Sequence, residues 1–277
     1  MMIEAALAAE AGSTVDNDRI SSRNEFEGAR VLVSGGTSGV GLVIAKEFAA
    51  AGAERIVLLG RNAGRGVSAT RIVGAEGAAV HFVGGDAGDP QGSGEMARQA
   101  SEYLDGRVDC FVSAVAPGGH LGPLDRQDPV ELGRVLVGLV LPVMQMNRAV
   151  LPYMKEHGGT MINIASDAAK VPTPGESVAG GAMAAITMFT RTLALEVKRH
   201  GIRVHAVTPS LIAGTETAER LVADDFGARI FAKITEKAQL GVPDATDIAA
   251  GVLWLASSAA AKITGQVISI NGGISAG

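Results

Sequence analysis

The stretch Arg30–Phe48, which reads RVLVSGGTSGVGLVIAKEF, joins a short β-branched run to an apolar helical run through a glycine-rich turn. Such a turn brings free backbone N–H groups together with the positive end of a helix dipole, which suits a pyrophosphate. Glycines also let the phosphates approach the backbone closely. The alternative is that these glycines serve only the packing of the helix on the sheet. We interpret the turn as a nucleotide site formed by Gly35, Thr37, Ser38, Gly39, Val40 and Gly41.

The alternation of β-branched and Ala-rich stretches continues to the C-terminus, which is typical of βαβ units. We expect strands at Arg30–Ser34, Arg55–Leu59, Ala79–Val83, Val108–Ala114, Thr160–Ala165, Arg203–Thr208 and Val267–Ile270. We expect helices near Val40–Ala51, Gly64–Gly74, Gly94–Leu104, Pro129–Met154, Gly180–His200 and Asp247–Leu255. This order predicts an α/β fold of Rossmann type, a doubly wound seven-stranded parallel sheet with helices on both faces. Residues 29–277 form its single domain, and residues 1–28 are expected to be a poorly ordered extension.

Composition narrows the class of protein. The chain has 277 residues, 47% hydrophobic and 19% charged, which is enough to bury a large core. Lys and Arg number 24 against 29 Asp and Glu, without a basic run, so nucleic acid is not expected as a partner. The single cysteine, Cys110, has no disulfide partner, and no signal peptide is apparent, which favours a reducing cytoplasm. The longest apolar run, Val135–Met146, is too short to span a bilayer, so no membrane is expected either.

The end of the second strand bears on the choice of cofactor. An NAD-binding domain usually carries an acid there to accept from the ribose hydroxyls, but this chain has Gly60 and Arg61. A guanidinium suits a 2′-phosphate, so we expect NADP(H) rather than NAD(H), although Arg61 could instead be a solvated surface residue. Asp86, at the end of the third strand, could accept from the adenine amino group, or Asp86 and Asp89 could only cap the turn before Pro90.

Several further motifs, in order and at characteristic spacing, resemble the short-chain dehydrogenases/reductases from about Glu27 to the C-terminus. They are Ser34–Gly41, Leu151–Met154, Ile162–Ser166, Ile202–Pro209 and Ile263–Gly273. The resemblance implies an oxidoreductase that acts on a carbonyl or alcohol with a nicotinamide cofactor. It also implies that Ser166 is the catalytic serine that polarises the substrate carbonyl.

The residues that differ from the family's motifs are those that carry out its chemistry. The family's N-N-A-G motif is replaced by Ser113–Ala116, and the asparagine of its proton relay aligns with Leu139. Its Y-x-x-x-K motif aligns with Ala179 and Met183, and the chain's two tyrosines, Tyr103 and Tyr153, belong to other segments. In the family the phenol is the general acid/base and the lysine lowers its pKa and binds the nicotinamide ribose. The resemblance therefore implies a degenerate catalytic centre and weaker cofactor binding.

Other polar residues near the expected cleft offer weaker candidates. His120 follows the fourth strand and could be a base, although a histidine on a Gly-rich loop is more often solvated. Lys170 and Glu176 belong to a loop with two prolines, which is expected to be a rigid substrate wall, or their charges could only face water. His205 is expected to fill a structural hydrogen-bonding position. The remaining candidates are Asp167, Ser177, Thr215 and Glu216.

Three functions remain open from the sequence. The first is an oxidoreductase with a small-molecule substrate. The second is a catalytically silent subunit that assembles with an active paralogue, and the third is an enzyme of non-redox chemistry that uses the same pocket. The helices Pro129–Met154 and Gly180–His200 are apolar over more than one face, which predicts an oligomer. The family implies a tetramer, either of identical chains or with an active paralogue. The segment Leu211–Leu240 carries no readable substrate specificity.

Overall fold

The computed structural model describes residues 25–115, 122–215, 218–219 and 225–276, without the side chains of 225–227 and 229–231. His120, Glu216 and the first 24 residues of the expected N-terminal extension lie outside this part of the chain.

The centre of the molecule is a seven-stranded sheet in the order β3-β2-β1-β4-β5-β6-β7, and every neighbouring pair is parallel. The strands are β1 (Arg30–Ser34), β2 (Arg55–Gly60), β3 (Ala79–Gly84), β4 (Cys110–Ser113), β5 (Gly159–Ile164), β6 (Ile202–Thr208) and β7 (Val267–Ser269). The reversal of strand order on either side of β1 is the doubly wound topology predicted from the sequence. The predicted fold class is therefore confirmed.

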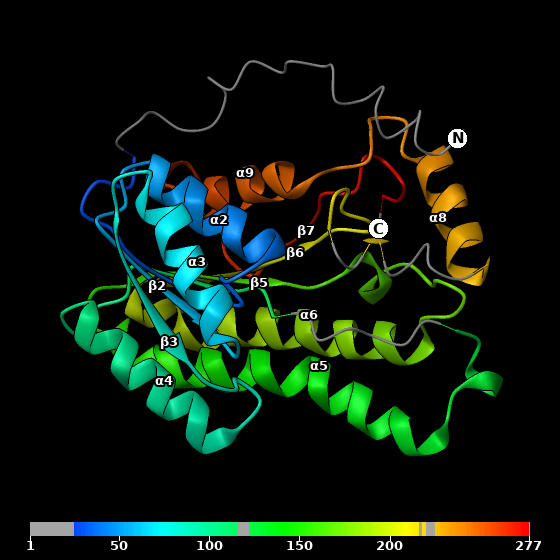
Figure 1. The fold of residues 1–277 in the computed structure, drawn as a ribbon, viewed down its shortest axis with the longest axis horizontal. Helices are drawn as coiled ribbons and strands as arrows, with labels where there is room; N and C mark the ends of the chain where they lie inside the picture. The colour runs from blue at the N-terminus through cyan, green and yellow to red at the C-terminus, as the bar shows by residue number, and fades with distance from the viewer. Residues whose placement is uncertain (1–24, 116–121, 216–217, 220–224, 277) are drawn as a thin grey trace.

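Helices cover both faces of this sheet (Figure 1). One layer holds α2 (Gly39–Ala50), α3 (Ala63–Gly74) and α9 (Ala245–Ala256). The other holds α4 (Pro90–Tyr103), α5 (Pro129–Val150) and α6 (Ser177–Val197). Helix α8 (Asp225–Lys237) follows β6 and stands at the end of the sheet where the C-terminus lies. The short 3₁₀ turns are η3 (Leu124–Arg126), η4 (Leu151–Tyr153), η5 (Asp167–Ala169), η6 (Lys198–His200) and η7 (Ser258–Ala260).

Caps explain where several helices begin. Helix α4 starts at Pro90, four residues before the expected Gly94, because the Asp89 carboxylate accepts from the Gly92 N–H at 2.5 Å. Helix α9 starts after Asp244, which forms a reciprocal capping box with Asp247.

Two apolar cores fill the space between the sheet and its helices. One joins β1 and β2 to α2, α3 and α9, and the other joins the opposite face to α4, α5 and α6. The ring of Phe26 packs edge-on against Phe48 with centroids 4.9 Å apart, and Phe26 is buried. The packed core therefore begins before the boundary at residue 29 that the sequence suggested.

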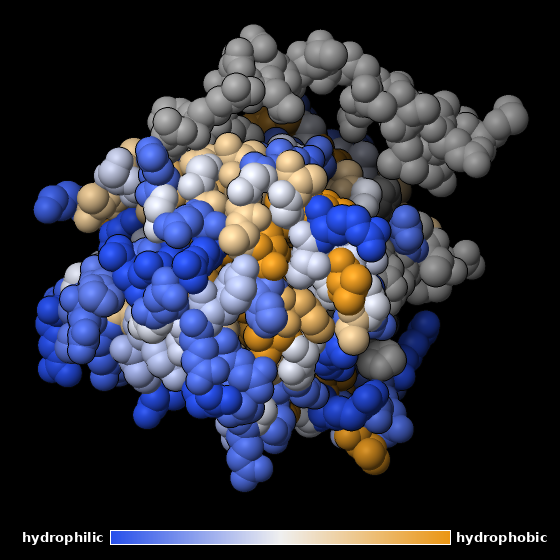
Figure 2. Space-filling model, turned by 60° about the vertical axis from the view of Figure 1, so that its left-hand side comes forward, coloured by the Kyte–Doolittle hydropathy of each residue, from blue (hydrophilic) through white to orange (hydrophobic). Residues whose placement is uncertain are grey.

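The outer sides of α5 and α6 keep large apolar side chains exposed. They include Leu136, Val137 and Leu141 on α5, and Met188 and Leu195 on α6. With their 3₁₀ extensions, Pro129–Tyr153 and Ser177–His200 are long and apolar enough to cross a membrane by length and composition. Both helices nevertheless pack against each other along one face of the sheet (Figure 1). On the face shown in Figure 2, hydrophilic side chains predominate and hydrophobic ones form small groups.

Candidate active site

The glycine-rich turn between β1 and α2 has the geometry that the sequence predicted. The Gly35 N–H donates to the Leu59 carbonyl at 2.9 Å, and Gly35 has φ +79°, which favours glycine. A Cβ at Gly35 would lie 2.6 Å from the Ala114 carbonyl oxygen. A Cβ at Gly41 would lie 2.3 Å from the Gly35 carbonyl oxygen. The turn therefore closes only when both positions lack a side chain.

The N-terminus of α2 leaves backbone donors available. Ser38 is the N-cap residue, but its side chain makes no capping hydrogen bond, and the first turn carries no acid. Free N–H groups here attract an anion, as expected for a pyrophosphate. Thr37 is nearly buried, and a Cβ at Gly60 would lie 3.0 Å from its hydroxyl oxygen. The glycine turn and the end of β2 therefore touch each other.

Arg61 and Asp86 follow the carboxyl ends of β2 and β3. Arg61 is exposed, and within the described residues no carboxylate lies within ion-pair distance of its guanidinium. The next residue, Asn62, caps α3. One carboxylate oxygen of the exposed Asp86 accepts from the Gly88 N–H at 2.8 Å. Asp86 thus stabilises the turn before α4, which is the capping role considered from the sequence.

Ser166 lies just beyond the carboxyl end of β5, at the same edge of the sheet as the glycine turn. Its side-chain oxygen accepts from the Ala168 N–H at 3.3 Å and so begins η5. The Asp167 N–H donates to the Pro209 carbonyl at 2.9 Å, which ties this turn to the end of β6. Ser166 is only partly buried, so its hydroxyl can face a ligand.

Behind Ser166 lies a buried polar cluster formed by Asp167, Lys170, Ser269, Asn271 and Ser275. Ser269 Oγ and Ser275 Oγ donate to the Asp167 carboxylate at 2.8 and 2.9 Å, and Asn271 Nδ2 donates to it as well. The Lys170 ammonium donates to Ser269 Oγ and lies 3.7 Å from Asp167 Oδ1. Burial by itself raises the pKa of Asp167, but the hydrogen bonds outweigh it and hold the pKa below its usual value.

Sequence reasoning named Asp167 and Lys170 as candidates but missed their contacts with Ser269, Asn271 and Ser275. The alternative that the charge of Lys170 only faces water is wrong, because the Lys170 side chain is only 12% exposed and η5 folds it back onto Asp167 and β7. The spacing of Asp167 and Lys170, three residues apart, was the available signal.

The start of α6 packs closely against the Ser166 turn. A Cβ at Gly180 would lie 2.9 Å from the Ala168 carbonyl oxygen. Met183 packs against the buried side chains of Val143, Ala165 and Ile186, and Ala165 immediately precedes Ser166. The side chain at position 183 therefore has apolar surroundings beside the serine. Ala179 is one turn earlier on α6, and Leu139 is buried in α5.

Both tyrosines of the chain belong to the opposite edge of the sheet. The Tyr103 carbonyl accepts from Arg55, the first residue of β2, and its ring stacks on His81 of β3 with centroids 4.7 Å apart. The Tyr153 carbonyl accepts from the Val108 N–H, just before β4. Ser166 follows the carboxyl end of β5, whereas Tyr103 and Tyr153 make these contacts near the amino ends of β2 and β4. Neither tyrosine therefore lies beside the serine.

Two further candidates have distinct environments. Glu176 precedes α6, and burial raises the pKa of its carboxyl while a hydrogen bond with Thr173 opposes the rise. His205 is fully buried in β6, where burial and the nearby Arg203 guanidinium lower its pKa to about 4. At neutral pH His205 is therefore an uncharged side chain inside the sheet. Within the described part of the chain, no group of His, Cys, Asp and Glu could hold a metal ion.

Comparisons with known proteins agree with this geometry. A family model described as enoyl-(acyl carrier protein) reductase matches residues 35–275. The chain is 32% identical to gluconate 5-dehydrogenase of Gluconobacter oxydans, over 90% of this chain and 95% of that one. It is also 32% identical to the 3-oxoacyl-(acyl-carrier-protein) reductase of Escherichia coli, over 90% and 98%.

Solved structures give the same result. A dehydrogenase/reductase from Sinorhizobium meliloti 1021 superposes with a TM-score of 0.79 at 27% identity, covering 90% of this chain and 96% of that one. The glycine turn, the position of Ser166 and these similarities converge, and the protein belongs to the short-chain dehydrogenase/reductase family of NAD(P)(H)-binding oxidoreductases.

Proposed function

We propose that this chain binds NADP(H) in preference to NAD(H) and transfers hydride between it and a small carbonyl or alcohol substrate, at a degenerate catalytic centre. The observation that carries the proposal is the environment of Ser166. The serine stands at the carboxyl edge beside Met183 and its apolar contacts, while both tyrosines lie at the amino edge. The carbonyl can be polarised there, but the protein supplies no phenol to deliver its proton.

The chemistry of the site follows from these groups. When bound, the nicotinamide supplies or accepts the hydride. Gly35 and Gly41 leave room for its pyrophosphate, and the start of α2 offers N–H donors. Ser166 orients the carbonyl by donating its hydroxyl hydrogen. Because the described residues place no phenol beside Ser166, the proton comes from water, and hydride transfer is slow.

The preference for NADP(H) is inferred from Arg61 and Gly60. No acid follows β2 to repel a 2′-phosphate. Arg61 is exposed and has no ion-pair partner among the described residues, and it follows Gly60, where an added Cβ would lie 3.0 Å from Thr37 of the glycine turn. A guanidinium donates two parallel hydrogen bonds to a phosphate.

Calorimetric titration with NADPH and NADH tests the cofactor preference. We expect NADPH to bind about tenfold or more tightly than NADH, because a charge-assisted contact is worth roughly 1.5–3 kcal/mol. Arg61→Ala should remove that difference and leave NADH binding unchanged. Arg65→Ala, which removes another exposed arginine four residues later, is the matched control and should change neither affinity. A preference for NADH, or an Arg61→Ala variant with full NADPH affinity, would refute the assignment.

The two alternatives from the sequence have less support. The similar proteins are named as dehydrogenases and reductases, which favours hydride transfer over non-redox chemistry or a silent subunit.

We also propose that the exposed apolar sides of α5 and α6 are covered in an oligomer, as a homotetramer or a heterotetramer with an active paralogue. Leu195 and Met188 are 65% and 59% exposed on α6, which is costly for large apolar side chains if they remain in water. Light scattering at micromolar concentration should give more than one chain per particle, and Leu195→Glu should dissociate it. A stable monomer would contradict this proposal.

A further inference from the structure

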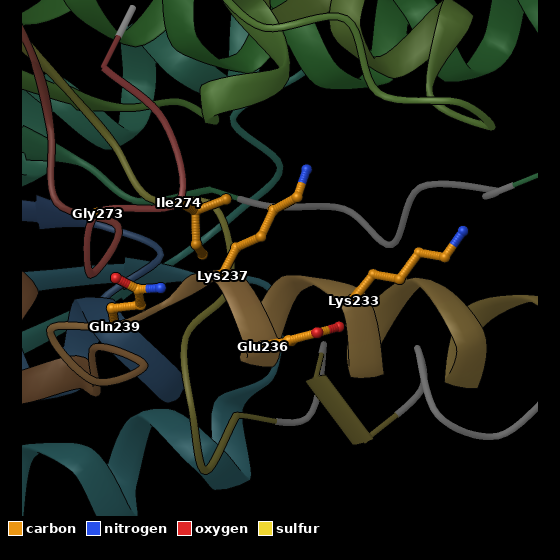
Figure 3. A pocket seen from close by; sticks show the side chains of 6 residues that line it. All are labelled: Lys233, Glu236, Lys237, Gln239, Gly273 and Ile274. Carbon is orange, nitrogen blue, oxygen red and sulfur yellow. The ribbon is translucent and has the colours of Figure 1, made fainter.

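An open cavity lies between the last turns of α8 and the C-terminal loop (Figure 3). Its volume is about 730 Å³, which is within the usual range for small-molecule sites. It is lined by Lys233, Glu236, Lys237, Gln239, Gly273 and Ile274. None of these residues was singled out from the sequence.

The cavity is joined to the Ser166 site by hydrogen bonds. Its wall at Gly273 and Ile274 belongs to the loop in which Asn271 and Ser275 donate to the Asp167 carboxylate. Asp167 directly follows Ser166. The Leu240 N–H donates to the Gly272 carbonyl at 3.0 Å, so the segment after α8 is tied to the same loop. The lysines and the serine therefore belong to one end of the sheet, held together by the C-terminal loop.

The charges in this cavity are not balanced. Lys233 and Lys237 are one helical turn apart and extend to the same side of α8, whereas Glu236 points along the helix (Figure 3). Within the described residues, no carboxylate lies within ion-pair distance of either ammonium. Side chains four residues apart on a helix have Cβ atoms about 5–6 Å apart, so both ammonium groups can reach one oxyanion.

These lysines are not placed to hold the pyrophosphate of the cofactor. The pyrophosphate site is the turn after β1, whereas α8 and the C-terminal loop follow β6 and β7. β7 is four strands away from β1 in the sheet, which at the usual strand spacing is roughly 19 Å.

We propose that Lys233 and Lys237 bind a carboxylate or phosphate group at the end of the substrate remote from its carbonyl. This inference rests on the proposed function, in which Ser166 holds the carbonyl, and it adds the substrate class: a carbonyl compound with an anionic tail. In a chain of net charge −5, two ammonium groups that have no carboxylate partner among the described residues form a local positive region that attracts such a tail. Two donors on one oxyanion also fix the direction in which the substrate enters.

Three ketones that differ only in their tail test the proposal: 5-oxohexanoate, 5-oxohexyl phosphate and methyl 5-oxohexanoate. Their affinities are measured by calorimetry, with and without saturating NADPH, so that no turnover is needed. We expect at least one anionic ketone to bind about tenfold or more tightly than the ester, because an anionic tail accepts charge-assisted hydrogen bonds and the ester does not. The tighter of the two anions then identifies carboxylate or phosphate as the natural tail.

Variants connect that preference to the two lysines. Lys233→Gln with Lys237→Gln should remove it, and Glu236→Gln should preserve or increase it. Lys262→Gln, at an exposed lysine outside the cavity, is the matched control and should change nothing. Circular dichroism checks that each variant is folded. Equal binding of ester and anions, or an undiminished preference in the double variant, would overturn the inference. NADPH titration of the same variants separates this outcome from a failure of the proposed function. A protein that binds NADPH but does not distinguish the three tails contradicts the inference alone.

Discussion

Two loops at the same edge of the sheet differ in what they require of the sequence. The turn after β1 works through its backbone: positions 35 and 41 must lack side chains, and the donors are N–H groups. The segment from Ser166 to Met183 can carry out acid/base chemistry only through side chains. Ala179 and Met183 fit α6 without strain, since both residue types favour helices. Substitutions can therefore remove side-chain chemistry and leave the fold and the nucleotide turn intact.

The largest expected loss of cofactor affinity comes from a substitution in the glycine turn, which depends on its backbone. Gly41→Ala places a methyl group 2.3 Å from the Gly35 carbonyl oxygen, so the turn must open. We expect NADPH affinity to fall about a hundredfold or more, because several charge-assisted contacts to phosphate are misaligned together. Titration calorimetry measures the loss.

Gly94→Ala is the matched control, because a Cβ there meets nothing within 4 Å. It lies inside α4, so it should leave NADPH binding unchanged and raise the free energy of unfolding by roughly 0.5–1 kcal/mol. Unchanged NADPH affinity in Gly41→Ala would mean that the turn is not the nucleotide site.

A second prediction concerns the buried cluster behind Ser166. Asp167→Ala removes the shared acceptor of Ser269, Asn271 and Ser275 and leaves the Lys170 ammonium without its neighbouring carboxylate. We expect the free energy of unfolding to fall by about 3–5 kcal/mol, the usual cost of breaking a buried pair. Denaturant unfolding measures it.

An exposed pair provides the contrast. Glu102→Ala removes the ion pair with Arg98 on the surface of α4, and its effect on stability should be small. Equal effects of the two substitutions would show that the cluster is not structurally important.

The smallest of the three effects is a pH dependence at His205. The pKa of His205 is lowered from 6.5 to about 4 by burial and by Arg203, so the unfolded chain takes up this proton first as pH falls. The stability from neutral His205 is thus complete above pH 6.5 and is lost as pH falls toward 4. The loss should be about 2–3 kcal/mol.

Urea unfolding at pH 7 and pH 4.5 measures this loss, with His205→Asn as the control that cannot titrate. If the variant loses as much stability as the unaltered chain over this range, His205 is not the responsible group.

The sequence predicted best what is local and periodic. Apolar runs predicted the number of strands and their order along the chain, and the glycine spacing predicted the tight turn between β1 and α2, because each follows from neighbours along the chain. The strand expected at Val108–Ala114 is confined to Cys110–Ser113. Strand ends depend on partners in other strands, here β1 and β5, which a single segment does not reveal.

The features that could not be predicted from the sequence depend on contacts between distant segments. Lys170 and Ser269 are 99 residues apart, so the spacing of Asp167 and Lys170 can indicate an ion pair but not that β7 buries it. Lys233 and Lys237 appear as ordinary helical surface charges until α8 is placed against the C-terminal loop. The anion site that we propose at these lysines is therefore suggested only by the folded chain.

The central proposal is that this protein keeps the glycine turn and the serine of its family, but that no proton donor is positioned beside the serine in the described part of the chain. The direct test is the rate of NADPH oxidation by the purified chain with a panel of ketones, before and after Ala179→Tyr with Met183→Lys. Our account predicts a slow rate for the unmodified chain and a gain of roughly a hundred- to ten-thousand-fold in the double variant. Turnover by the unmodified chain at about ten per second, typical of enzymes, and unaffected by Ser166→Ala, would contradict it.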